Sequence, residues 1–355
     1  MSRELTRHKE DGPARHTEGG QAIGVDLGAT TVKAGIVSRE GKILANYSIE
    51  TLADKGPTAV IRQISFTIHQ LLNQSKGTDI VGIGIGSPGV VALDGGVVRY
   101  PPNFSAWTEV SLGEEIQKEF RMAVDVENDA NVAALAEAAF GAGKGEKNFL
   151  FVIWGTGVGG GIILNGGIYR GPYGGAGEIG HVTIDYNGPP CGCGSYGCIE
   201  AYVGQRYLSQ RTRDRLKPLL EVAERNRSKK PVSKIVDLVN GNLDLIEPRV
   251  ISMAAQQGDP LAHEMLEEAG KLLGIGIASV LNVLDLRLVI IGGGISAADE
   301  FVFKAIERSI HSRVLKSSKG KIRVAPAQLG NMAGILGAAS LVWMHEGEEY
   351  VERPG

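Results

Sequence analysis

The sequence predicts a mixed α/β fold made of two similar units, and three observations support this interpretation. A strand, a turn rich in glycine and threonine, and a returning strand occupy residues 22–37. The same order returns over residues 149–164, so the pattern repeats within one chain. Around both hairpins, segments with strand spacing alternate with segments of helical spacing. We therefore expect a duplicated α/β unit with a ligand in the cleft between the copies.

The first unit is expected to alternate strands and helices after its hairpin. Apolar residues at helical spacing and short buried runs between glycines distinguish the two kinds of element. Asparagine and aspartate before an alanine-rich stretch are typical of a helix start. The expected strands are 22–27, 32–37, 41–45, 80–85 and 123–127, and the expected helices are 58–73, 111–120 and a helix that opens at 128–131 and runs through 140.

The second unit begins with strands at 149–154 and 159–164, and a hairpin turn at 165–167 follows the second strand. Residues 205–260 are polar and helical, and we expect them to form a solvated surface. A long helix at 261–284, a buried strand at 286–291 and a final helix at 331–344 complete the pattern. The expected domains are a disordered tail at 1–20, a small domain at 21–128 to which helix 331–345 returns, and a large domain at 129–330.

Composition excludes several classes of protein. The 355 residues are 43% hydrophobic and 22% charged, which is ordinary for a globular protein. A net charge of −3 gives no general attraction to nucleic acid. No apolar run reaches the roughly 18 residues of a membrane span, and residues 1–20 lack the apolar core of a secretory signal, so we expect a cytoplasmic protein. The 50 glycines cluster at the ends of apolar runs, which favours tight loops near a ligand.

The cysteines are confined to one short segment. Cys191, Cys193 and Cys198 are the only cysteines of the chain, and His181 precedes them by ten residues. Three cysteines and one histidine form a closed tetrahedral set for zinc, so we expect a structural Zn²⁺ ion with these four ligands. Free thiols beside a core histidine are a weaker alternative. A disulfide is weaker still, because the cysteine count is odd and no secretory segment is seen.

The same segment carries more than a zinc site needs. Glycines between the cysteines are expected to supply unusual backbone angles (Gly192, Gly194 and Gly197). Two carboxylates, Glu178 and Glu200, flank the metal ligands. We therefore expect the metal to shape a loop that has a second task.

Glycine loops in the chain do not match a dinucleotide fold. Residues 84–89 and 155–160 both fit G-x-G-x-x-G, but strand-like residues follow each loop where that fold requires a helix. The turns at 28–31 and 155–157 instead present backbone N–H groups and hydroxyls, which suits phosphate oxygens. Asp26 precedes the first turn, and a carboxylate beside phosphates indicates Mg²⁺. Lys33 is a candidate for neutralising a phosphate, although a lysine in a strand is as often solvated.

Five segments together carry a resemblance to a known family. The chain resembles the ROK family of repressors, uncharacterised frames and sugar kinases, within the actin-like and hexokinase-like superfamily, over about residues 22–345. The histidine–cysteine segment is highly specific and the glycine turns are not. The matching segments are 26–30, 127–131, 155–161, 178–181 and 191–200. The resemblance implies two actin-like (ribonuclease H-like) α/β domains with an interdomain cleft.

The resemblance also implies a reaction, the transfer of a phosphoryl group from ATP to a hexose. It implies that Asp129 is the general base that takes the proton of the sugar 6-hydroxyl. His181 would serve zinc with one ring nitrogen and face the sugar with the other. The implied sugar-binding residues are Asn103, Asn128, Glu178, His181 and Glu200. The implied nucleotide and Mg²⁺ residues are Asp26, Gly28, Thr30, Thr31, Lys33, Thr156, Gly157 and Gly293.

Several alternatives stay open at the level of sequence. Glucose is the favoured hexose, and an N-acylhexosamine or mannose is the alternative. Polyphosphate is an alternative to ATP as the phosphate donor. A sugar-responsive repressor would need a DNA-binding module ahead of the sugar fold, and only about twenty polar residues precede the first strand, which favours a kinase. A zinc-stabilised sugar-binding protein without catalysis is the last alternative. By family analogy we expect a homodimer or homotetramer.

Overall fold

The computed structural model describes residues 20–75, 79–92, 96–226, 232–294 and 300–344. Its described residues divide into two compact units, residues up to 132 with those from 334 onward, and those between 133 and 333. The tail expected at 1–20 lies almost wholly outside the described residues. The expected domain limits stay a prediction. Within the described part of the chain, no helix has the length and apolar character that a bilayer crossing needs.

The first unit is organised around a five-stranded sheet with the order β3-β2-β1-β4-β8. The central strand β1 (Gln21–Leu27) pairs antiparallel with β2 (Thr31–Val37), and β2 pairs antiparallel with β3 (Ile43–Glu50). On its other side β1 pairs parallel with β4 (Ile80–Ser87), which pairs parallel with β8 (Val124–Asn128). The hairpin and the parallel crossovers confirm the mixed α/β class that the sequence predicts.

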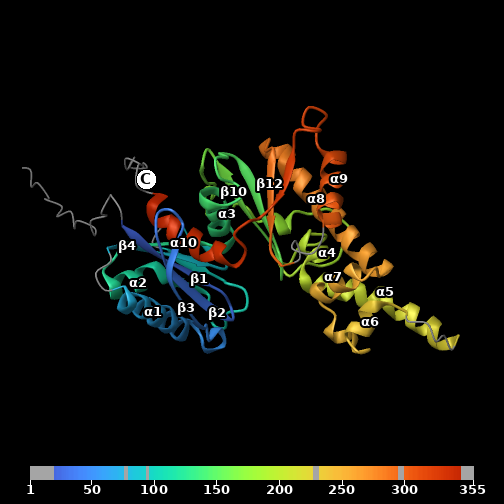
Figure 1. The fold of residues 1–355 in the computed structure, drawn as a ribbon, viewed down its shortest axis with the longest axis horizontal. Coiled ribbons are helices and arrows are strands. Elements are labelled where there is room, and N and C mark those ends of the chain that lie inside the picture. Colours follow the sequence, from blue (N-terminus) through green and yellow to red (C-terminus); the bar gives the residue numbers. More distant parts are fainter. Residues whose placement is uncertain (1–19, 76–78, 93–95, 227–231, 295–299, 345–355) are drawn as a thin grey trace, which may run out of the picture. The chain divides into compact units, whose positions relative to one another are not determined.

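Helices cover both faces of this sheet, as Figure 1 shows for α1 and α2 on one side and α10 on the other. Alternate strand residues point to opposite faces, so Ile23 and Val25 pack with Ile64 and Ile68 of α1. The remaining elements of the unit are η1 (Ala53–Lys55), α1 (Pro57–Gln74), α2 (Leu112–Phe120), α10 (Ala333–Met344) and a small antiparallel sheet of β5 (Val90–Val91), β6 (Val97–Arg99) and β7 (Glu109–Ser111).

Glycines in the strands let α10 approach the sheet. A Cβ atom on Gly24 would lie 2.0 Å from the carbonyl oxygen of Ile335, and one on Gly84 would lie 1.7 Å from that of Ala338. Only glycine leaves room for helix backbone at these distances. The expectation that the glycines mark ligand loops is therefore wrong for these two positions, since packing between a sheet and a helix requires them.

The second unit repeats the arrangement with the order β11-β10-β9-β12-β13. Here β9 (Phe149–Trp154) pairs antiparallel with β10 (Val158–Leu164), which continues into β11 (Gly167–Ile168). On its other side β9 pairs parallel with β12 (Leu288–Gly292), which pairs parallel with β13 (Arg323–Pro326). The strand order thus confirms the internal repeat seen in the sequence.

Helices supply most of the core of the second unit. The pair α8 and α9 packs closely because Gly270 and Gly274 admit the backbone of α9. Its helices are α3 (Asp129–Phe140, whose first turn belongs to the first unit), η2 (Ile179–His181), α4 (Glu200–Val203), α5 (Gln205–Arg225), α6 (Lys234–Leu238), η3 (Leu243–Leu245), α7 (Pro248–Gln256), α8 (Pro260–Leu284), α9 (Glu300–Arg313) and η4 (Gly330–Met332).

The solvated surface expected at 205–260 has a buried side. Leu208, Leu216, Ile235 and Ile251 are fully buried in the core of the second unit. The segment is rich in charged residues but also has a buried apolar face, so the expectation of a solvated surface is wrong for that face. The strand β13 and the helix α9 were not predicted, because a four-residue edge strand and a helix with mixed charge give weak patterns.

Candidate active site

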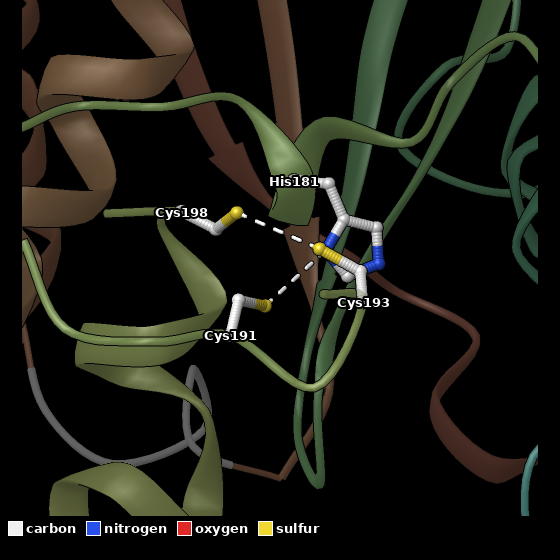
Figure 2. Close-up of side chains that lie close together, drawn as sticks. All are labelled: His181, Cys191, Cys193 and Cys198. Carbon is white, nitrogen blue, oxygen red and sulfur yellow. Dashed lines mark hydrogen bonds between the residues drawn. The ribbon is translucent and has the colours of Figure 1, made fainter. Parts of the chain in front are cut away.

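Four side chains from η2 and the loop after it converge on one point, as Figure 2 shows. The ligand atoms of His181, Cys191, Cys193 and Cys198 all lie within 4.8 Å of one another. The His181 Nδ1 atom is 3.6 Å from the Cys191 sulfur, and the Cys193 and Cys198 sulfurs are 3.8 Å apart. The four residues that the sequence singled out therefore form one cluster.

These distances fit a zinc ion. With Zn–S of about 2.3 Å and Zn–N of about 2.0 Å, tetrahedral angles place two sulfurs about 3.8 Å apart and a sulfur and a nitrogen about 3.6 Å apart. Burial raises the pKa of the Cys198 thiol to about 12, and it also raises the pKa of Cys191. A divalent cation reverses this tendency, because the thiolate is the form that coordinates metal.

The loop holds its shape through backbone hydrogen bonds. The N–H of Cys191 donates to the carbonyl oxygen of Ser195, and the N–H of Gly197 donates to that of Pro189, both at 2.8 Å. Gly194 and Gly197 adopt φ angles of 91° and 64°, so the prediction of unusual backbone angles is confirmed for these two glycines. Gly192 is not among the glycines with positive φ, so the prediction is wrong there.

The two carboxylates near the cluster differ in their surroundings. Glu178 is exposed, and its Oε2 atom lies 4.0 Å from Nε2 of His181. His181 therefore faces the sulfurs with one ring nitrogen and Glu178 with the other. Glu200 begins α4 and is partly buried, and its Oε2 atom accepts the N–H of Val158 at 3.0 Å. Of the two carboxylates, Glu178 is therefore the more exposed.

The second glycine turn joins β9 to β10. The Gly155 N–H donates to the Gly157 carbonyl oxygen at 3.0 Å, and Thr156 is exposed at the tip. Gly293 follows β12 with a φ angle of 96°, and a Cβ atom there would lie 2.2 Å from the carbonyl oxygen of Trp154. Gly293 therefore lies directly against the end of β9, from which the turn starts.

A pocket of 610 Å³ lies beside this turn. Its lining is mostly polar and charged, and Leu245 and Ile246 are its apolar side chains. Of its lining, the sequence predicts only Thr156 as part of a site, because the other residues lie in the segment 205–260 that was expected to form a solvated surface. Its lining includes Thr156, Gln205, Arg206, Arg213, Asp244 and Leu245.

The first glycine turn joins β1 to β2. Its Gly28 N–H donates to the Thr31 carbonyl oxygen at 3.1 Å, and Thr30 is exposed at the tip. Thr51, which is fully buried, donates its hydroxyl to the Gly28 carbonyl oxygen at 2.6 Å, and its N–H to the Thr30 carbonyl oxygen at 3.0 Å. No local pattern in the sequence indicates this role for Thr51, since it lies 23 residues from Gly28.

Asp26 and Lys33 face each other across the first hairpin. They are register partners of β1 and β2, and the Lys33 Nζ atom lies 4.0 Å from the Asp26 Oδ2 atom. Burial raises the pKa of Asp26, and the Lys33 ammonium opposes that rise. A Cβ atom on Gly334 would lie 2.5 Å from the Asp26 carboxylate carbon, so α10 closes one side of this carboxylate.

Asn128 and Asp129 mark the start of α3. The Asn128 Oδ1 atom accepts the N–H groups of Ala130 and Asn131, and its Nδ2 donates to the Gly89 carbonyl oxygen at 3.0 Å. Asn128 is therefore the N-cap of α3, and most of the hydrogen-bonding capacity of its side chain is taken up within the protein. Asp129 is exposed, and its Oδ1 accepts the Ala130 N–H at 2.8 Å.

Asn103 lies in the first unit on a short loop. Its φ angle is 68°, a left-handed conformation that asparagine tolerates, and its side chain is exposed. The buried rings of Phe104 and Trp107 meet edge to face at 5.4 Å below the loop. The Trp107 Nε1 atom donates to the Val98 carbonyl oxygen, so the rings fix the loop on the small sheet.

Comparisons with known proteins extend over nearly the whole chain. The model of the ROK family matches residues 22–345. The glucokinase of Thermotoga maritima is 37% identical over 320 residues, which cover 90% of this chain and 96% of that protein. The xylose repressor of Bacillus subtilis is 30% identical over 328 residues, which cover 92% of this chain and 78% of the repressor.

A solved structure adds ligands to the comparison. A ROK family glucokinase from Streptomyces griseus, in complex with glucose and AMPPNP, is 35% identical. It matches 91% of this chain and 99% of its own chain, with a TM-score of 0.76. The described residues therefore adopt the actin-like fold of that glucokinase.

Proposed function

Because the chain belongs to the ROK family, we propose that it is a hexose kinase that transfers the γ-phosphoryl group of ATP to the 6-hydroxyl of glucose. Similarity to glucokinases over about nine-tenths of the chain supports this function, and so does the ROK glucokinase that is solved in complex with glucose and AMPPNP. The observation that carries the proposal is the exposed Asp129 carboxylate at the start of α3, in a chain with this similarity.

Asp129 is the proposed general base. Its carboxylate accepts one backbone N–H through Oδ1, and the exposed side chain remains accessible to a substrate hydroxyl. The partial positive charge at the start of a helix lowers the basicity of an aspartate. The carboxylate can still take the proton as the transition state develops, because general-base catalysis requires reach and charge rather than a high pKa alone.

We assign the sugar hydroxyls to the five residues that the resemblance implies. Asn103 and Glu178 are exposed, and His181 has its Nε2 atom directed away from the sulfurs, which supports their roles. One Nδ2 hydrogen of Asn128 donates to Gly89, and the other can donate to a sugar hydroxyl. The Oε2 atom of Glu200 accepts from Val158, and its Oε1 atom can accept from a sugar hydroxyl. Zinc held by the four-residue cluster fixes η2 and the following loop, and so orients the residues that bind the sugar.

The phosphates of ATP are assigned to the two glycine turns. Exposed Thr30 and Thr156 and the backbone N–H groups beside them suit phosphate oxygens. Asp26 lies at the end of β1, just before the first turn, and Mg²⁺ bound with ATP needs few protein carboxylates, so its surroundings fit this ion. We assign Gly28, Thr31, Lys33, Gly157 and Gly293 to the same site, and the pocket beside Thr156 to the rest of the nucleotide.

Substitution of Asp129 tests the proposal. The D129N variant should lose at least about 100-fold in kcat while its affinity for glucose stays within a few fold, because only proton transfer is removed. The rate is measured in a coupled assay over glucose, mannose and N-acylhexosamines, with ATP and with polyphosphate as donors. The exposed carboxylate of Glu114 on α2 supplies the control variant E114Q, which should keep full activity.

Each other outcome has a defined meaning. A D129N protein that retains more than a tenth of the rate contradicts the role of Asp129. An unaltered protein that binds glucose without turnover indicates a binding protein or a regulator. Preference for mannose or an N-acylhexosamine selects the alternative kinase. A sugar-responsive regulator, for which the xylose repressors are the precedent, would release or bind DNA with the sugar.

Two further expectations accompany the proposed function. The resemblance predicts a homodimer or homotetramer, which sedimentation measures directly. We also propose a cytoplasmic location, because three free cysteines in a metal-binding cluster suit a reducing compartment.

A further inference from the structure

Glu200 contacts the second glycine turn directly. Its Oε2 atom accepts the N–H of Val158, the residue that follows the turn, at 3.0 Å. A Cβ atom on Gly157 would lie 2.4 Å from the same oxygen, so the carboxylate fills the space beside the turn. This contact joins residues that are 42 positions apart in sequence.

The residues that follow Glu200 form hydrogen bonds with the same turn and with the end of β9. The N–H of Gln205 donates to the carbonyl oxygens of Thr156 and Gly155, at 3.0 and 3.3 Å. The buried Trp154 ring donates its Nε1 hydrogen to the Val203 carbonyl oxygen at 2.8 Å. Residues 200–205 are therefore hydrogen-bonded to Gly155 and Thr156 of the β9–β10 turn and to the strand residue on each side of it, Trp154 and Val158.

The opposite end of this segment belongs to the cysteine cluster. The N–H of Ala201 donates to the Cys198 carbonyl oxygen at 3.1 Å, and the N–H of Ile199 donates to that of Val182, the neighbour of His181. Only Ile199 lies between Cys198 and Glu200 in the sequence. A short, hydrogen-bonded stretch of backbone therefore connects the cysteine cluster to Glu200 and so to the turn.

We propose that Glu200 is a positioning residue for the triphosphate, in addition to any contact with the sugar. This inference rests on the proposed function, because it requires that the second turn binds phosphate. One carboxylate oxygen holds the N–H of Val158 and so fixes the turn in the shape that presents its other N–H groups. The carboxylate acts through the backbone, since a direct contact with phosphate would bring like charges together.

Nucleotide binding without sugar isolates this role. The probe is AMPPNP with Mg²⁺, titrated calorimetrically into the full-length protein. E200A removes the acceptor and should weaken AMPPNP at least about 10-fold, because a hydrogen bond to a charged group is lost. E200Q keeps an acceptor oxygen at the same reach, so its AMPPNP affinity should stay within about threefold of the unaltered protein. A residue that only binds sugar would leave AMPPNP affinity unchanged in both variants.

A second pair of variants protects the test against general disruption. A methyl group at Gly157 meets Glu200 Oε2, whereas one at Gly155 meets no atom within 4 Å. G157A should therefore weaken AMPPNP more than G155A does. The penalty of G157A should shrink in the E200A background, because the opposing oxygen is gone. Zinc content is measured for every variant, and equal zinc separates the effect from loss of the cluster.

The outcomes separate the two levels of the proposal. Unchanged AMPPNP affinity in E200A, or additive penalties of G157A and E200A, overturns the positioning role and leaves the kinase function standing. An unaltered protein that does not bind AMPPNP overturns the proposed function together with this inference.

Discussion

The β1–β2 turn and the β9–β10 turn hold the same position in two sheets of the same strand order, and different contacts secure them. The first turn is held by hydrogen bonds from Thr51, the residue that follows β3 in the same sheet. The second is held by Glu200 and α4, which belong to the loop that carries the cysteine cluster. The comparison shows that a repeated backbone can be stabilised at equivalent points by unrelated contacts.

The units also differ in where glycine permits close packing. In the first, Gly24 and Gly84 lie in strands and admit α10. In the second, Gly270 and Gly274 lie in α8 and admit α9. A sheet that accepts a helix directly on its backbone leaves little room for change, whereas two helices can shift along each other. We therefore expect substitutions to be less tolerated in the strand glycines.

Loss of the metal cluster should have the largest effect on stability. Of the two turns, only the β9–β10 turn should show faster hydrogen exchange. C198S should reduce bound zinc to near zero and lower the free energy of unfolding by more than about 4 kcal/mol, because a ligand of a structural metal is lost. Hydrogen exchange should accelerate at the N–H groups of Val158 and Gln205 but not at those of Gly28 and Thr51. S195A, at an exposed position of the same loop, is the control. Equal acceleration in both turns would refute the difference between them.

Overpacking beneath α10 should come next. G84A places a methyl group 1.7 Å from the Ala338 carbonyl oxygen, and a backbone atom cannot rotate away. We expect a loss of about 3 kcal/mol in the free energy of unfolding, measured by urea denaturation. G274A, where the nearest atoms lie at 2.7 Å, should cost less. G167A, with its nearest atom at 4.0 Å, should be close to neutral, and a G167A effect as large as that of G84A would contradict the packing argument.

The smallest effect should come from the anchor of the first turn. T51V keeps the shape of Thr51 and removes the donor to the Gly28 carbonyl oxygen, so it should cost about 1 kcal/mol of stability. AMPPNP affinity should fall several fold, because the first turn loosens. T67V removes a similar buried hydroxyl bond, to the Gln63 carbonyl oxygen in α1, and should cost similar stability without changing AMPPNP affinity. If T67V weakens AMPPNP as much, the local role of Thr51 is wrong.

The local parts of the fold and the site followed from the sequence. Strand–turn–strand patterns depend on alternation and turn residues that are neighbours in the chain, so both hairpins were predicted. The three cysteines lie within eight positions, and a loop that short has few ways to separate them, so the cluster was also predicted. The start of α3 followed from Asn128 and Asp129, because a cap acts on the N–H groups directly after it.

The long-range contacts were decided by tertiary structure alone. Thr51 reaches Gly28, Glu200 reaches Val158, and Gly84 admits the helix that ends the described chain, over separations that no local pattern encodes. The sequence singles out Glu200 as a carboxylate near the cysteines, but it gives no contact partner for any of these three residues. Their partners depend on which helix packs on which sheet, and that choice arises from burial of apolar surface over the whole unit rather than from neighbouring residues.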